Sequence, residues 1–304
     1  MTAVTCGSVV PVAPPQQRGL WQRPYLLLTA AALLWASNFL LGRALPAGIA
    51  PISLCFWRWV LALPFVLPMA APHLRRDWPA IRRSLPLLAA LAAAGLAGSN
   101  TLAYMALRAT TATSALLVQS ALPMAILLFG LLLFGERPRL RQVGAMLLAT
   151  AGVLCVILAK PGAGGALNGG TLLAGAAMLA QALYAALLRE RPTLHPTSFL
   201  FATFALAALL LLPFQIAPGT PLPVADARGM AALLYLAVGP SILAFFLFNR
   251  GVELVGSARA AVFFYLMPVF GTLLAVPLLH ERIGATELGG FALVGLGFLI
   301  TRNT

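Results

Sequence analysis

The stretch ALPMAILLFGLLLFGERPRLRQVGAMLLATAG (residues 121–152) returns later in the chain as YLMPVFGTLLAVPLLHERIGATELGGFALVGLG (residues 265–297). Five features recur 145 residues apart, at Pro123/Pro268, Glu136/Glu281, Arg137/Arg282, Gly144/Gly289 and Gly152/Gly297. The runs that begin at Pro51 and Pro196 match at the same offset, whereas the third and eighth apolar runs drift by a few residues. The chain therefore predicts a duplicated unit.

The composition predicts an integral membrane protein. Of 304 residues, 61% are hydrophobic and 9% are charged, and the mean hydropathy is +0.94. A soluble domain carries about 25% charged residues, so this chain could not cover a globular surface with polar groups. The apolar runs are continuous, about 18–24 residues long, and lack the alternation of a barrel strand. An all-α integral membrane fold follows.

Breaks at proline, glycine and charged residues predict ten transmembrane helices. Their approximate spans are 24–43, 51–71, 86–107, 112–134, 140–159, 169–188, 197–217, 229–249, 257–279 and 284–301. The repeat groups them into a first five-helix repeat, residues 24–160, and a second, residues 169–302. Because five is odd, the second repeat must be inverted in the membrane, an arrangement that recurs in secondary transporters.

The distribution of basic residues predicts the orientation. With the N-terminus inside, the inner segments carry 14 Lys or Arg and the outer segments carry 5. Positive residues concentrate on the cytoplasmic side, so we expect a multi-pass protein with both termini cytoplasmic. Residues 1–23 are Pro-rich and lack the positive start and apolar core of a signal peptide, and we interpret them as a disordered cytoplasmic tail.

The net charge of +13 raises the question of nucleic-acid binding. The arginines stand singly or in small groups at helix ends, which carries topology information and predicts no nucleic-acid partner. The three cysteines supply no disulfide framework. We expect no cofactor and no metal. The expected partners are a small-molecule substrate and the lipid bilayer, with the chain a monomer or a weak homodimer.

Four features together resemble a known superfamily. They are the two five-helix halves, LLWASNFLLGR in the first span, Pro51 with Arg58 in the second, and the P…LLFGE…Q-x-G…G ending of the fourth and fifth spans. This combination resembles the EamA-type drug/metabolite transporter superfamily over residues 24–302, and in size the YddG-type amino-acid exporters of bacterial inner membranes. The second half departs from the pattern, since LAQALYAAL stands where WASN would recur.

One cation lies inside an oily helix, in CFWRWVLALPF (residues 55–65). Arg58 is about seven residues, ~10 Å, from the outer end of the second span. Its counterpart 145 residues on is Thr203, so the fold does not require arginine in both halves. Two interpretations stay open: Arg58 snorkels outward or bonds the carbonyls of a neighbouring helix end, or it faces a central cavity and binds a substrate carboxylate.

Other polar and aromatic side chains at membrane depth should face inward, because isolated amides in lipid are costly. Helix–helix hydrogen bonding would explain each one alone. As a set they predict a cavity with aromatic walls and a few polar groups, suited to an amphipathic organic solute. The predicted substrate-binding residues are Trp35, Asn38, Arg58, Asn100, Tyr104, Gln119, Gln181, Tyr184 and Tyr265.

The seven acidic residues all map to loops or helix ends, and no histidine lies in a span centre. Because ion-coupled carriers commonly use such groups at membrane depth, we expect facilitated or exchange-type transport. An intramembrane enzyme would need paired acids, Ser–His or metal clusters, and a channel would need charged rings or a carbonyl filter. None is visible, so we predict no catalytic residue.

The sequence thus predicts a secondary transporter of small organic metabolites that works by alternating access. By resemblance, the substrates are amino acids, including aromatic or apolar ones, exported across a bacterial inner membrane. Drugs, purines and other metabolites remain alternatives, followed by a channel or an intramembrane enzyme.

Overall fold

The computed structural model describes residues 19–44, 49–110, 112–119, 121–135, 169–217 and 227–279, with isolated positions between 140 and 151 and between 289 and 296. Within these residues the regular structure is entirely helical, which confirms the all-α prediction. The predicted spans 140–159 and 284–301 lie mostly outside the described residues, so the count of ten spans stays a prediction.

In the described part of the chain, six helices are long and apolar enough to cross a membrane. They are Pro24–Ala44, Pro51–Arg83, Leu85–Ala109, Gly169–Glu190, Pro196–Gln215 and Gly229–Val255. Two shorter apolar helices are Leu122–Phe134, which follows Gln119, and Arg259–Gly271, which contains Phe264. The chain is therefore a multi-pass membrane protein.

The helices of the first half are α1 (Pro24–Ala44), α2 (Pro51–Arg83), α3 (Leu85–Leu91), the π-helix η2 (Ala92–Gly98), α4 (Ser99–Ala109), α5 (Ala112–Gln119) and α6 (Leu122–Phe134). Those of the second half are α8 (Gly169–Leu187), α9 (Pro196–Gln215), α10 (Ala227–Leu236), the π-helix η4 (Ala237–Leu243), α11 (Ala244–Val255), α12 (Ser257–Ala261), η5 (Val262–Tyr265) and α13 (Leu266–Leu279). Short 3-10 turns, η1 (Leu20–Gln22) and η3 (Leu188–Glu190), precede α1 and follow α8.

The repeat keeps its register from helix to helix. The starts of α1 and α8, of α2 and α9, of α4 and α11, and of α5 and α12 are each 145 residues apart. The π-helices η2 and η4 match over their whole length at the same offset. The predicted drift between the third and eighth spans is therefore wrong for their central parts, because the two halves share backbone geometry where their side chains differ.

Polar side chains at the two π-helices donate hydrogen bonds to backbone carbonyls there. A π-turn widens the helix and moves backbone carbonyls out of the ordinary hydrogen-bond ladder. Ser99 Oγ donates to the Gly95 carbonyl at 2.6 Å, and Asn100 Nδ2 donates to the Leu96 carbonyl at 3.0 Å. In η4, Ser241 Oγ donates to the Leu236 carbonyl at 2.7 Å. The carbonyls of η2 thus accept from Ser99 and Asn100 at the start of α4, and η4 has Ser241 folded back on the backbone of the preceding turn.

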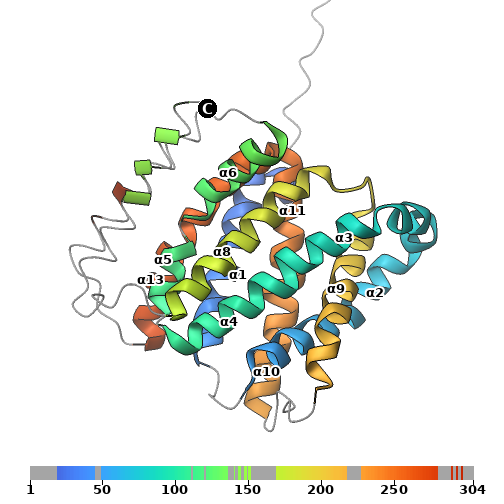
Figure 1. Ribbon diagram of the computed structural model, residues 1–304, viewed down its shortest axis with the longest axis horizontal. Helices are drawn as coiled ribbons and strands as arrows, with labels where there is room; N and C mark the ends of the chain where they lie inside the picture. The colour runs from blue at the N-terminus through green and yellow to red at the C-terminus, as the bar shows by residue number, and fades with distance from the viewer. Residues whose placement is uncertain are drawn as a thin grey trace, which may run out of the picture.

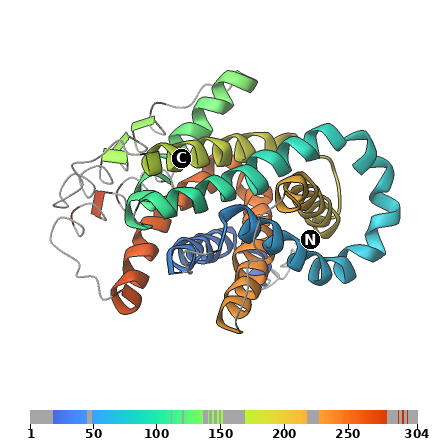
Figure 2. The same cartoon turned by 60° about the horizontal axis from the view of Figure 1, so that its bottom comes forward.

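The halves interlock instead of packing as two separate bundles. Helix α2 packs along α9, its counterpart in the other half, as Figure 1 shows at the right. Helix α1 packs on α11 and α13, and α8 packs on α4 and α6, so each half inserts its first helix into the other. Figure 2 shows α2 bending in a wide arc at the edge of the molecule, consistent with its internal prolines. Residues from both halves therefore meet at the centre.

The predicted fourth and ninth spans are not continuous helices. In the fourth, Ala121 forms a turn before α6 begins at Leu122, and the ninth passes through the 3-10 turn η5 before α13 begins. Pro123 lies in the first turn of α6, where its missing N–H costs nothing. Interrupted helices at corresponding positions of two halves are a recurring sign of a transporter binding site.

Close packing at the π-helix gives a prediction about stability. A Cβ at Gly95 would lie 2.2 Å from the ring of Tyr184 and 2.7 Å from its Cβ. Because Tyr184 is fully buried, the ring has no room to retreat. We expect Gly95→Ala to lower the free energy of unfolding by about 1–3 kcal/mol, measured by thermal unfolding in detergent.

Gly175→Ala, on α8, is the matched control, because a Cβ there meets no atom within 4 Å. It should leave stability unchanged or raise it slightly, since alanine is the better helix former. Equal losses in both variants would contradict the packing of η2 against α8.

Candidate functional site

Arg58, on α2, is the most deeply placed cation of the described residues, with no exposed side-chain surface. Its guanidinium lies within hydrogen-bond distance of four side-chain oxygens. Nε donates to Ser241 Oγ (2.5 Å), and the two N–H groups of Nη1 are shared among Asn38 Oδ1 (3.0 Å), Asn100 Oδ1 (2.9 Å) and Tyr104 Oη (2.8 Å).

These partners come from both halves of the fold. Asn38 lies on α1, Asn100 and Tyr104 lie on α4, and Ser241 lies in η4 of the second half. Tyr104 also donates its hydroxyl to Asn38 Oδ1 at 2.7 Å, which closes the network. Arg58 therefore neither snorkels outward nor bonds helix-end carbonyls; it joins three neighbouring elements through their side chains.

The positive charge of Arg58 is stabilised by hydrogen bonds to uncharged side-chain oxygens. No carboxylate among the described residues pairs with it, and its Nη2 has no hydrogen-bond partner there. Insertion scales put a central arginine near +2.5–3.5 kcal/mol, while hydrogen bonds to charged groups contribute about 1.5–3 kcal/mol each. The three N–H groups of Nε and Nη1 are enough to offset the insertion cost, and Nη2 keeps unused donor capacity.

A small cavity lies next to this network. It has a volume of about 40 Å³, and Asn38 and Asn100 line it while also accepting from Arg58. Arg58 itself is not part of the lining. The full lining is Trp35, Asn38, Phe39, Ser99, Asn100, Ala103, Gln119, Leu122, Gln181, Phe245, Phe264 and Met267.

In this cavity, corresponding positions of the two halves carry chemically different side chains, so the cavity is two-sided, with a polar side and an aromatic side. Asn100 and Phe245 are counterparts 145 residues apart, and so are Gln119 and Phe264, and all four line the cavity. At both positions the first half supplies an amide and the second half supplies a phenyl ring. The duplicated backbone thus places polar side chains on one wall of the cavity and aromatic rings on the other.

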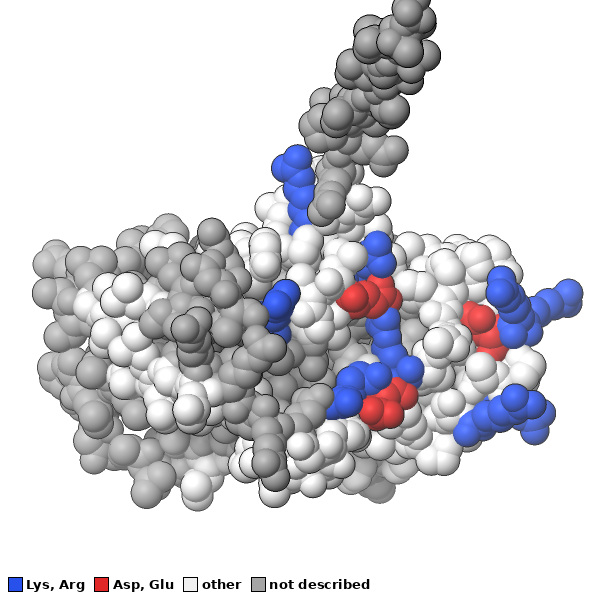
Figure 3. All heavy atoms as spheres, turned by 90° about the horizontal axis from the view of Figure 1, so that it is seen from above, with Lys and Arg blue, Asp and Glu red and all other residues white. Residues whose placement is uncertain are grey.

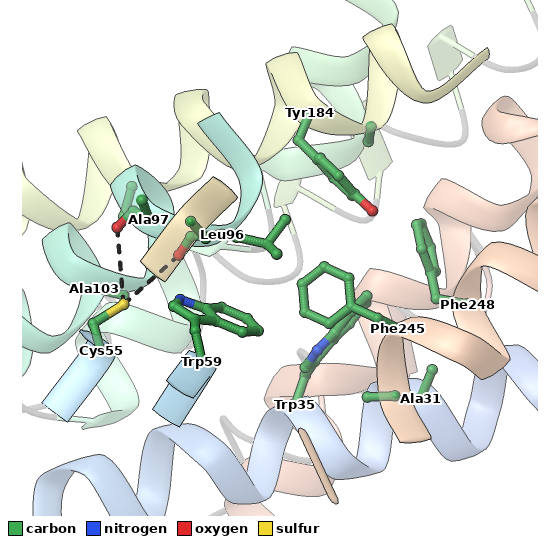
Figure 4. Close-up of a cluster of buried hydrophobic side chains, with 14 of the residues drawn as sticks. Ala31, Trp35, Cys55, Trp59, Leu96, Ala97, Ala103, Tyr184, Phe245 and Phe248 are labelled. Atoms are coloured by element: carbon green, nitrogen blue, oxygen red, sulfur yellow. Dashed lines mark hydrogen bonds between the residues drawn. The ribbon is translucent and has the colours of Figure 1, made fainter. Parts of the chain in front are cut away.

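The aromatic wall is well ordered by contacts with Trp35. The Trp35 ring stacks on Phe264 at 5.3 Å between centroids and 2° between planes, and meets Phe245 edge-on at 5.3 Å. Its indole N–H donates to the Pro240 carbonyl in η4 at 3.1 Å. Figure 4 shows Trp35 and Phe245 pointing toward each other, with Trp59 and Tyr184 at the sides. The wall is therefore a rigid apolar surface.

The polar wall continues onto α8. Ser99 Oγ donates to Gln181 Oε1 at 2.9 Å, which brings the glutamine of the second half to the amides of the first. Gln119, at the end of α5, is buried and lines the same space. Among the described residues, no Asp, Glu or His lines this cavity.

The nine predicted site residues divide into three groups. Arg58 and Tyr104 belong to the network beside the cavity. Tyr184 and Tyr265 are buried outside the lining, and the Tyr184 hydroxyl donates to Asn249 Oδ1 at 3.4 Å. The five that line the cavity are Trp35, Asn38, Asn100, Gln119 and Gln181.

Sequence reasoning missed most of the aromatic wall. Phe245, Phe264 and Met267 are apolar residues in apolar helices, so nothing in their own type marked them. Two of them are the counterparts of the predicted residues Asn100 and Gln119, so applying the offset of 145 to the predicted set would have found them. Ser241, the acceptor of Arg58 Nε, is polar at membrane depth, but this signal alone did not place it among the predicted site residues.

The network predicts unequal roles for two buried tyrosines. Tyr104→Phe removes an acceptor of a charged donor and the donor to Asn38, so we expect a loss of about 1.5–3 kcal/mol in the free energy of unfolding. Tyr184→Phe removes one long bond to Asn249 and should cost less, about 0.5–1 kcal/mol. Chemical unfolding in mixed micelles measures both. A larger loss in Tyr184→Phe would contradict the network as described.

The chain is similar to known transporters along its length. A transporter of Archaeoglobus fulgidus, described as uncharacterized, is 28% identical over 287 residues, which cover 92% of this chain and 97% of that protein. The aromatic amino acid exporter YddG of Ancylobacter novellus is 29% identical over 209 residues, covering 67% of this chain and 68% of that protein. A solved crystal structure shares the fold with a TM-score of 0.73 over 91% of this chain and 95% of that one, at 24% identity.

The EamA-like transporter family matches the chain twice, at residues 22–158 and 168–303. The two matches account for both repeats and for nearly the whole sequence. A transporter of this family implies a small-molecule substrate and a lipid bilayer around the protein. The chain therefore belongs to the EamA-like transporter family.

Proposed function

We propose that the protein carries amino acids with aromatic or apolar side chains by alternating access. The observation that carries this proposal is the two-sided cavity beside Arg58, with amides on one wall and stacked aromatic rings on the other. An amino acid has the same division, with charged groups at one end and an apolar side chain at the other. The aromatic amino acid exporter among the similar proteins supports the same substrate class.

The substrate carboxylate is assigned to Arg58. Its Nη2 is buried and has no hydrogen-bond partner among the described residues, so two N–H groups are free to donate to a carboxylate. A single guanidinium suits one carboxylate, whereas a sugar phosphate usually needs several basic groups. Asn38 and Asn100 accept from Arg58 and also line the cavity, so they lie between the cavity and the guanidinium. A carboxylate in the cavity would reach Arg58 by way of these two side chains.

The side chain is assigned to the aromatic wall. A ring placed on the Trp35–Phe264 stack would gain offset or edge contacts worth about 0.5–1.5 kcal/mol beyond its buried area. Met267 adds a polarizable, adaptable surface at the same wall. This wall favours aromatic and large apolar side chains over small polar ones.

The small volume of the cavity and the contribution of both halves to its walls support alternating access. A volume of about 40 Å³ is far below the ~300–1,000 Å³ of small-molecule sites, so the walls must separate to admit an amino acid. The polar wall comes mainly from the first half and the aromatic wall from the second. Movement of one half against the other would open the cavity on either side, with the π-helices and the breaks at α5/α6 and η5 as flexible points.

The remaining features of the proposal come from the sequence. The protein would lie in a bacterial inner membrane with both termini cytoplasmic, act as a monomer or weak homodimer, and move substrate outward. Facilitated or exchange transport fits a cavity whose described lining holds no Asp, Glu or His. The alternative substrates are purines, drugs or other flat metabolites, which the Trp35–Phe264 stack would also accept.

The first test removes the cation. In proteoliposomes with radiolabelled phenylalanine, Arg58→Gln should lower kcat/KM about 10–100-fold, the loss expected for one charged hydrogen-bonded contact. The matched control is Thr203→Val, which changes the repeat counterpart of Arg58, a buried residue that bonds only its own helix. Equal transport by Arg58→Gln and wild type, with both folded by thermal unfolding, would contradict the assignment.

The second test removes parts of the substrate. Unlabelled 3-phenylpropionate keeps the carboxylate and ring, and phenethylamine keeps the amine and ring. We expect the carboxylate compound to compete with labelled phenylalanine and phenethylamine to compete at least tenfold more weakly, because only the former can accept from Arg58. The reverse order of competition would contradict the proposed orientation, and strong competition by purines would favour the alternative substrate class.

A further inference from the structure

Helix α2 continues well beyond the apolar run that predicted it. The run ends near residue 71, whereas the helix continues unbroken to Arg83. The added segment, PHLRRDWPAIRR (residues 72–83), carries four arginines and one tryptophan. Met69, half exposed at 49%, is the last large apolar residue on the outside of the helix before this segment. Arg75 follows six residues later, ~9 Å along the helix.

One face of this basic segment is fixed to the protein. The Asp77 carboxylate accepts a hydrogen bond from the backbone N–H of His195 at 3.0 Å. The His73 ring stacks on the His195 ring at 3.6 Å between centroids, and Ile81 is buried. His195 is itself the N-cap of α9, so the segment is docked on the start of a membrane-spanning helix. The arginines therefore lie on a segment whose position relative to the start of α9 is fixed.

The remaining surface of the segment is basic and exposed. Arg75, Arg76, Arg82 and Arg83 are all exposed, and Trp78 between them is 53% exposed. Arg75, Trp78 and Arg82 follow at i, i+3 and i+7, which places them along one side of the helix. Asp77, the one acidic residue of the segment, is half-buried and bonded to His195. Figure 3 shows basic side chains gathered at the right-hand end of the molecule, where α2 turns into α3.

A groove of about 590 Å³ runs beside this segment. Arg76, Asp77, Arg191, His73 and His195 contribute to its lining. Partial burial and the neighbouring His73 ring lower the pKa of His195 below its ordinary value of 6.5. The His195 ring is therefore neutral at pH 7, and the positive charge at the groove comes from the arginines.

We propose that residues 72–83 of α2, with the adjoining groove, form a binding site for the headgroups of anionic phospholipids. Guanidinium groups donate paired hydrogen bonds to phosphate oxygens, and a tryptophan ring between them suits the headgroup level of a bilayer. The occupant is a lipid because the basic face is continuous with the lipid-exposed face of the same helix, through Met69. The site lies on the side of the membrane that the sequence predicts to be cytoplasmic, and it is independent of the substrate cavity.

The test is native mass spectrometry of the purified full-length protein, titrated with phosphatidylglycerol or phosphatidylcholine. Wild type should retain phosphatidylglycerol at least tenfold more tightly than phosphatidylcholine. Changing Arg75, Arg76, Arg82 and Arg83 to Gln together should lower the phosphatidylglycerol affinity roughly tenfold or more, since each arginine near an anionic surface contributes. Changing the same four to Lys keeps the charge and should restore most of the affinity.

A charge-matched control separates a built site from general attraction. Changing Arg18, Arg23, Arg139 and Arg141 to Gln removes the same charge from other segments predicted on the same side, and should leave the phosphatidylglycerol affinity within about twofold. An equal loss in this control would overturn the proposal. So would displacement of the lipid by soluble glycerol phosphate at the same concentration, which would make the site one for free phosphate esters.

Trp78→Ala supplies a second readout that removes no charge. It should weaken phosphatidylglycerol binding several-fold without changing the thermal unfolding midpoint, because the ring is exposed and supports no core contact. Unchanged lipid affinity in both Trp78→Ala and the four-arginine Gln variant would overturn the proposal.

Discussion

Taking one guanidinium into the middle of a membrane protein constrains everything around it. Arg58 has no carboxylate partner among the described residues, so neutral oxygens must gather on it from several directions. They come from α1, α4 and η4, which ties both halves of the molecule to one point. Removing Ser241 Oγ leaves the buried Nε–H unpaired, which costs more than the bond itself contributes. The positions of three helices are thus linked to one side chain.

The π-helices explain how these oxygens reach the centre. Each π-turn disturbs the backbone ladder at the same place in its half, and short polar side chains repair it. Ser241 both repairs η4, through its bond to Leu236, and accepts from Arg58. Asn100 does the same at η2, donating to Leu96 and accepting from Arg58. The polar side chains that bond the backbone at the two π-helices thus also accept hydrogen bonds from the charged Arg58 guanidinium.

The two halves share a backbone arrangement, but the side chains at corresponding positions of the site differ in chemistry. The counterpart of Arg58 is Thr203, which bonds its own helix, and the counterparts of Asn100 and Gln119 are the rings of Phe245 and Phe264. A strictly symmetric site would have two polar walls or two aromatic walls. The observed site has one of each, a division that the proposed amino-acid substrate would match in a single orientation.

Much of the fold could be predicted from the sequence, because length, hydropathy and charge placement are strong signals in membrane proteins. The offset of 145 even predicts where helices begin. Interruptions were harder to predict: the 3-10 turn η5 lies within an apolar run, where composition gives no warning. The length of α2 was also missed, since hydropathy stops near residue 71 while the helix continues. Polar members of the site could be predicted because polarity is rare at that depth, but Phe245 and Phe264 could not, because phenylalanine is ordinary there.

The central claim is that the buried guanidinium is where a substrate carboxylate binds. The most direct measurement is an experimental structure of the protein with bound phenylalanine. The account predicts the carboxylate within hydrogen-bond distance of the Arg58 guanidinium and the phenyl ring against Trp35 and Phe264. A ligand in the reverse orientation, or one bound away from Arg58 with the four-acceptor network unchanged, would contradict it.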